Sequence, residues 1–204
     1  MATKWMSRGK HDEIATVDLL NKYNFMTLGV CGALSLLGFW LQFKNTKIRG
    51  ETFGRNYALL EDKYGEEHRQ LFGTHVNKYG YPDMGNNLYS DLLPYKDWVK
   101  INNGQRCHEN MVSFNPVFFT SAFISTLTFP KFTFGMSFVY FICRFFYTRS
   151  YLSFRGYNKA TALEEIMKLE LVMLVGSAML SSIAICGFHN HAAVRRFIPK
   201  RFKK

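Results

Sequence analysis

Three long stretches without a charged residue constrain this chain more than any other feature. They cover residues 24–43, 110–130 and 171–188, and each is 18 to 21 residues long. Because an α-helix rises about 1.5 Å per residue, helices of this length cross a hydrocarbon core of about 30 Å. The sequence therefore predicts an integral membrane protein and excludes a disordered chain or a small disulfide scaffold.

A fourth apolar stretch follows the second after a tight turn at Pro130. Residues 132–151 are apolar apart from Arg144 and Arg149. A charged side chain in a span normally faces the interior of the helix bundle, or it extends to the lipid headgroups near the end of the span. Both interpretations are open for these two arginines. The spans that we predict are residues 23–43, 111–129, 132–151 and 171–188.

The charged residues are concentrated between and around these spans. Residues 44–109 hold ten Lys or Arg and nine Asp or Glu, and we call them the polar body. Within it, residues 54–72 have the periodicity of an amphipathic helix, and the Gly and Pro content of residues 79–94 is typical of a structured loop. The predicted fold is all-α, an integral membrane four-helix bundle with an enlarged polar loop between helices 1 and 2.

This organisation gives three regions along the chain. We predict an amphipathic N-terminal arm at residues 1–22, a four-span membrane bundle at residues 23–188 that includes the polar body, and a basic tail at residues 189–204. The tail carries six Lys or Arg and no acid, and the whole chain has a formal charge of +11. Such a tail favours anionic membrane lipids or an acidic partner protein, and we expect no nucleic acid partner.

Cysteine and histidine spacing argues against a metal site. The four cysteines have no CxxC pair, and three of them lie in apolar stretches, which fits neither a zinc site nor a disulfide framework. His189 and His191 are two residues apart and would point to different sides of a helix. We therefore expect no metal.

Two short motifs resemble those of a known family. Residues 105–110 read QRCHEN at the start of the second span, and residues 144–151 read RFFYTRSY at the end of the third. They resemble the Arg-x-His-x-Asn and Arg-x-x-Tyr-x-x-x-Tyr signatures of the membrane-associated proteins in eicosanoid and glutathione metabolism, the MAPEG family. Residues 78–84, KYGYPDM, are most similar to the type 3 branch of the microsomal glutathione S-transferases in that family.

The resemblance implies a four-helix bundle that forms homotrimers and binds glutathione between subunits, near one membrane face. The residues that match the signatures are then the candidate glutathione ligands: Arg106, Asn110, Arg144 and Tyr147. The candidate catalytic residues are Tyr151, Arg155 and Lys159. Members act through the glutathione thiolate, so the site must supply positive charge and donors to a thiol whose pKa starts near ~8.5.

The chain departs from the family pattern at two places. Ser113 stands where members usually have a carboxylate that meets the glutathione ammonium, and Phe114 follows it. Exchanging a charge-assisted hydrogen bond of roughly 1.5–3 kcal/mol for a neutral one should weaken binding about ten- to a hundredfold. The arginine that stabilises the thiolate also has no clean equivalent, because Asn158 and Lys159 occupy its neighbourhood.

These departures leave two hypotheses about function. In the first, the chain has a weakened glutathione site and is a structural subunit of a larger membrane assembly, such as a mitochondrial respiratory complex. In the second, it is an active glutathione transferase or peroxidase. A third interpretation makes Arg106, His108 and Arg144 only polar groups that stabilise the bundle. A mitochondrial membrane and the endoplasmic reticulum both fit the sequence.

Overall fold

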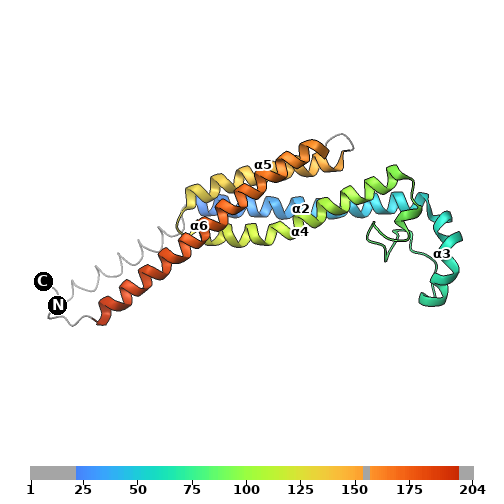
Figure 1. Cartoon of the computed structure of the whole chain (residues 1–204). Coiled ribbons are helices and arrows are strands. Elements are labelled where there is room, and N and C mark those ends of the chain that lie inside the picture. Colours follow the sequence, from blue (N-terminus) through green and yellow to red (C-terminus); the bar gives the residue numbers. More distant parts are fainter. Residues whose placement is uncertain (1–21, 154–156, 198–204) are drawn as a thin grey trace. The chain divides into compact units, whose positions relative to one another are not determined.

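The described part of the chain is entirely helical apart from its connections. The computed structural model describes residues 22–153 and 157–197, with only the backbone at residues 157–159 and 188–197. Five α-helices and one short 3-10 helix form this part, and these ranges contain no strand (Figure 1). Nearly all of the predicted N-terminal arm and the end of the basic tail lie outside the described residues.

Four of the five α-helices are long and overlap the four predicted spans. They are α2 (Lys22–Arg55), α4 (Tyr95–Thr126), α5 (Pro130–Leu152) and α6 (Tyr157–Phe197). Between α2 and α4 lie the shorter α3 (Tyr57–Phe72) and the 3-10 helix η1 (Ser90–Leu92). A proline opens α5, where its missing N–H is not needed by the helix.

Two helices are long and apolar enough to cross a membrane by length and composition. They are α2 and the Ala160–Gly187 part of α6. Within the described residues, α4 and α5 do not meet this criterion. The apolar stretch of α5 is interrupted by Arg144 and Arg149, and α4 contains many Asn, Ser and Thr residues as well as charges in its first half.

The structure corrects the predicted ends of the helices. α2 continues beyond residue 43 to Arg55, and α4 begins at Tyr95, so the polar body contains much more helix than an enlarged loop would. In this part of α2 the side chains of Lys44, Lys47 and Glu51 are exposed, while Ile48 and Arg49 are buried, and Ile101 is buried on α4. The amphipathic helix predicted at residues 54–72 is confirmed as α3.

The connection before the fourth span is also shorter than predicted. The predicted spans leave residues 152–170 as the connection between the third and the fourth, whereas α6 already begins at Tyr157. Hydropathy alone finds where a helix becomes apolar, and it does not find where the helix starts. The described residues form five α-helices, which are the four long ones and α3, the helix predicted within the polar body.

The chain divides into two compact units, which are described separately. Unit 1 comprises Met1–Ala33, Pro116–Ile142 and Ile166–Lys204, and unit 2 comprises Leu34–Asn115 and Cys143–Glu165. Each unit contains a segment of every long helix.

Small hydroxyl side chains pack together inside unit 1. Ser125 Oγ lies 2.7 Å from Thr133 Oγ1 and 2.8 Å from Ser177 Oγ, so α4, α5 and α6 meet at this point. In the same unit, the ring of Phe118 on α4 stacks on the ring of Tyr140 on α5, and the two ring centroids are 4.4 Å apart. Small residues let helices approach closely, and their hydroxyls satisfy one another where water is absent, as is common between membrane helices.

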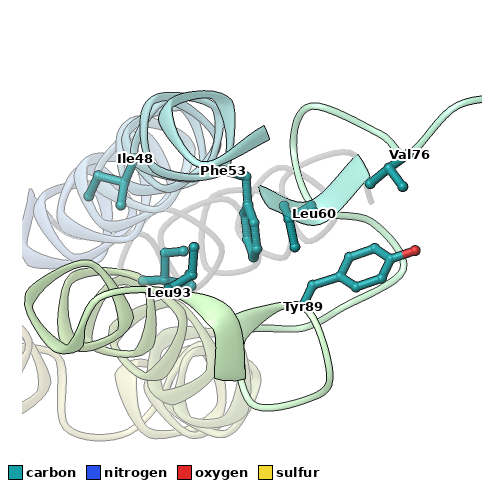
Figure 2. Packing of buried hydrophobic residues seen from close by; sticks show 7 residues of the cluster. Ile48, Phe53, Leu60, Val76, Tyr89 and Leu93 are labelled. Carbon is teal, nitrogen blue, oxygen red and sulfur yellow. The ribbon is translucent and has the colours of Figure 1, made fainter. Parts of the chain in front are cut away.

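Unit 2 has a hydrophobic core of its own within the polar body. Its buried members come from α2, α3, the connection between α3 and α4, and α4 itself (Figure 2): Ile48, Phe53, Leu60, Val76, Tyr89, Leu93 and Ile101. Burial of apolar area stabilises a fold by about 25 cal/mol per Å². The polar body is therefore a folded structure and not a flexible connection.

Candidate functional site

Helices α4 and α5 bring most of the predicted site residues into unit 2. α4 carries Arg106 and Asn110, and α5 carries Arg144, Tyr147 and Tyr151. Within each helix the residues are three or four positions apart, so they share one helix face.

Asn110 and Tyr147 are in direct contact. Asn110 Nδ2 donates a hydrogen bond to the Tyr147 hydroxyl, and the two atoms are 2.6 Å apart. The Tyr147 side chain is fully buried, and its ring centroid lies 5.1 Å from that of Tyr151. The amide thus occupies one acceptor position of the hydroxyl, whose O–H stays able to donate to another group.

Arg144 is buried beside this pair. Only 1% of it is exposed, and its guanidinium carbon lies 5.5 Å from the Tyr147 ring centroid and 5.9 Å from that of Phe114. Aromatic faces stabilise a desolvated guanidinium through their quadrupoles. The sequence left open whether Arg144 and Arg149 face the interior of the bundle or extend to the lipid headgroups. Arg144 is in the interior, whereas Arg149 is exposed. Arg144, Tyr147, Tyr151 and Asn110 therefore form one cluster, which we call the Arg-Tyr cluster.

Arg106 lies instead on an open groove of unit 2. The groove has a volume of about 580 Å³ and is bounded by α4, by Met84 and Asn86 of the preceding loop, and by Tyr151 of α5. Tyr151 belongs to both places, since its ring packs on Tyr147 and also lines the groove. The structure thus places the predicted ligands in two adjoining environments, a closed cluster and an open groove.

Glu109 is an acidic group of this groove that the sequence reasoning did not select. Gln105 Nε2 donates to Glu109 Oε1 at 3.0 Å, and Asn45 Nδ2 donates to Gln105 Oε1 at 3.3 Å. Helical spacing could have identified Glu109 from the sequence, because it lies three residues after Arg106 and one turn before Ser113, on the same part of α4. A guanidinium and a carboxylate on one wall can bind the carboxylate and the ammonium of an amino-acid-like ligand.

The loop that borders the groove is organised by Asp83. Its carboxylate is buried and accepts hydrogen bonds from the backbone N–H groups of Tyr89 and Ser90 at 2.9 and 2.8 Å. Burial alone would raise the pKa of Asp83, but hydrogen bonds from the backbone N–H groups of Gly85 and Ser90 outweigh it, and the pKa lies below its ordinary value.

Arg49 fixes the same loop from α2. Its Nη2 donates to the backbone carbonyl oxygen of Asp83 at 2.5 Å, and its guanidinium carbon lies 4.7 Å from the Tyr81 ring centroid. The motif at residues 78–84, noticed in the sequence for its resemblance, therefore has a structural role: it holds Met84 and Asn86 at the groove. The sequence reasoning missed Arg49, because it is 34 residues from its partner in the chain.

The structure says little about the other residues that were predicted to belong to the site. Arg155 lies outside the described residues, and only the backbone of Lys159 is described. Ser113 is exposed on α4. The roles assigned to these residues stay predictions, as does the binding of glutathione by the others.

The described residues are thus all-α, with two helices apolar enough to cross a membrane and a buried polar cluster in unit 2. The chain belongs to the MAPEG family, whose pattern matches residues 27–186. The family resemblance read from the motifs is thereby confirmed, and the nearer likeness to its type 3 branch stays a prediction. None of the curated proteins matches the chain.

Proposed function

We propose that the chain crosses the membrane four times, has a weakened glutathione site, and serves as a structural subunit of a larger membrane assembly. The observation that carries this proposal is the folded polar body of unit 2 with its exposed apolar side chains. A mitochondrial respiratory complex is the first candidate assembly, and the endoplasmic reticulum is the alternative location.

The exposed face of the polar body supports a protein partner. Leu71 is 77% exposed and Leu88 is 65% exposed, and Leu59 and Phe72 of α3 are exposed as well. These side chains lie outside both candidate spans, so the hydrocarbon core of a membrane does not explain their exposure. Apolar side chains on an otherwise charged surface are typical of a protein interface.

The state of the site supports a weakened affinity for glutathione. Arg144 and Tyr147, two of the candidate ligands, are buried against neighbouring side chains, so binding through them requires a rearrangement. Ser113 offers a neutral hydroxyl where a carboxylate would pair with the ammonium. The loss of that charge-assisted bond corresponds to about ten- to a hundredfold in affinity.

Native electrophoresis of membranes solubilised in mild detergent tests the subunit proposal. We expect the chain to migrate in a complex much larger than a homotrimer, and Leu71→Gln combined with Phe72→Gln should release it. Asp62→Asn combined with Glu67→Gln, on the same helix, is the matched control and should leave the complex intact. Migration of the wild-type chain as a small homotrimer would refute the proposal.

A second candidate function is an active glutathione transferase or peroxidase. The observation that favours it is the open groove, where Arg106, Glu109 and Tyr151 could hold glutathione by its carboxylate, ammonium and peptide or thiol. The thiolate would then be stabilised by Tyr151 together with Arg155 or Lys159. Calorimetric titration of the detergent-purified chain tests this candidate, and an absence of binding up to millimolar glutathione excludes it.

A further inference from the structure

A hollow in unit 1 lies at the turn between α4 and α5. It has a volume of about 530 Å³, and its walls include the aromatic rings of Tyr23, Phe129 and Phe132. Both phenylalanines are exposed although they are large and apolar. The Tyr23 ring is held in place on one side by Phe134 of α5, with ring centroids 6.1 Å apart.

Two lysines converge on this hollow. Lys22 Nζ lies 5.2 Å from the Tyr23 ring centroid, and Lys131 Nζ lies 5.9 Å from the same centroid. They come from the start of α2 and the start of α5, which are far apart in the chain. No acidic side chain in the described part of the chain forms an ion pair with either lysine.

The charges and the apolar walls select one kind of occupant. Two ammonium groups that line one hollow make it positively charged, which favours an anion as its occupant. Exposed aromatic walls beside the lysines would in turn be covered by hydrocarbon. A turn that joins two consecutive membrane helices lies at the depth of the headgroups, where tyrosines and lysines meet phosphate groups.

We propose that this hollow binds an anionic phospholipid of the bilayer. Its phosphate lies between Lys22 and Lys131, and its acyl chains pack on Phe129 and Phe132. The proposal rests on the membrane crossing of α4 and α5, which is part of the proposed function. It depends neither on a glutathione site nor on a partner subunit.

Native mass spectrometry of the full chain in non-ionic detergent tests the proposal. The probes are dioleoylphosphatidylglycerol and dioleoylphosphatidylcholine, which have the same acyl chains and differ in net charge. We expect the wild-type chain to retain the anionic lipid preferentially. In Lys22→Gln combined with Lys131→Gln, this preference should fall by about fivefold for each lysine, roughly 25-fold in total.

A matched double variant controls for general electrostatic attraction. Lys63 and Lys78 each lie over the ring of the following tyrosine, at 5.3 and 5.5 Å, but over two separate rings in unit 2. Lys63→Gln combined with Lys78→Gln therefore removes the same charge and should keep the lipid preference. The charge-conserving Lys22→Arg with Lys131→Arg should keep it as well, which separates loss of charge from loss of fold.

Three results would overturn the proposal. The first is that the wild-type chain retains both lipids equally. The second is that the Lys63 and Lys78 control loses as much lipid preference as the Lys22 and Lys131 variant. The third is that millimolar inorganic phosphate displaces the lipid. The last result would show an anion site that does not use the acyl chains. Since the electrophoresis experiment reports only on assembly, failure of either experiment is distinguishable from failure of the other.

Discussion

Replacing Asp83 by asparagine should open the loop between α3 and α4. Oδ1 of Asp83 accepts hydrogen bonds from the backbone N–H groups of Gly85 and Asn87, and Oδ2 accepts them from Tyr89 and Ser90. Asparagine keeps the shape of the side chain but replaces one oxygen by an NH₂ group, so two backbone donors face another donor in either orientation. Each unsatisfied buried group costs about 1–3 kcal/mol, which gives about 2–6 kcal/mol for the pair.

Tryptic cleavage at Lys78 measures this opening. Lys78 is exposed at the start of the loop. When opening and closing are fast relative to cleavage, the cleavage rate follows the population of the open form. We therefore expect Asp83→Asn to be cleaved roughly 30- to 25,000-fold faster than the wild type. Asp62→Asn makes the same chemical change at an exposed position of α3 and should have no effect.

The same carboxylate predicts a pH dependence for the loop. The pKa of Asp83 is lower in the folded chain than in an unfolded one, where it is ~3.9. Its contribution to stability is therefore fully present above the unfolded pKa and is lost as the pH falls through the folded pKa. The reasoning is refuted if Asp83→Asn is cleaved at the wild-type rate at neutral pH.

Three further substitutions test other contacts. Ser113→Glu should strengthen glutathione binding about ten- to a hundredfold by calorimetry; an unchanged affinity would mean that the pocket is closed. Gly80→Ala should lower the free energy of unfolding by about 2–4 kcal/mol in denaturant titrations, because φ is 73° there and a Cβ would collide with Phe53. Tyr147→Phe should lower the free energy of unfolding by about 1–2 kcal/mol in the same measurement, because the Asn110 amide loses its acceptor. Wild-type stability of the Gly80 or the Tyr147 variant would contradict the contact on which that prediction rests.

The sequence predicted the helices of the fold better than their ends. Uncharged runs locate the apolar part of α2 and α6, but Lys44, Lys47 and Glu51 continue α2 as an amphipathic helix that hydropathy does not detect. The periodicity of its apolar residues was sufficient to locate α3, although the residues that α3 buries, Leu60, Gly65 and His68, are spaced five and three positions apart.

The candidate site could be predicted only along each helix separately. Helical spacing places Arg106 near Asn110, and Tyr147 near Tyr151, without any information on how α4 meets α5. The hydrogen bond from Asn110 to Tyr147 joins residues 37 positions apart. Contacts of this kind, like that of Arg49 with the loop, depend on packing between elements. The family resemblance supplied the grouping, and Glu109 was missed because its significance lies in the groove that it lines.

The core of the polar body has a consequence for the order of folding during synthesis. All seven of its buried members lie between Ile48 and Ile101, so every one has been synthesised before any of the last three helices is complete. The hydroxyl contact of unit 1, in contrast, joins Ser125 to Ser177 across 52 residues and needs α6. Contacts between residues close in the chain form first. The nascent chain can thus complete the polar body while its final span is still being translated.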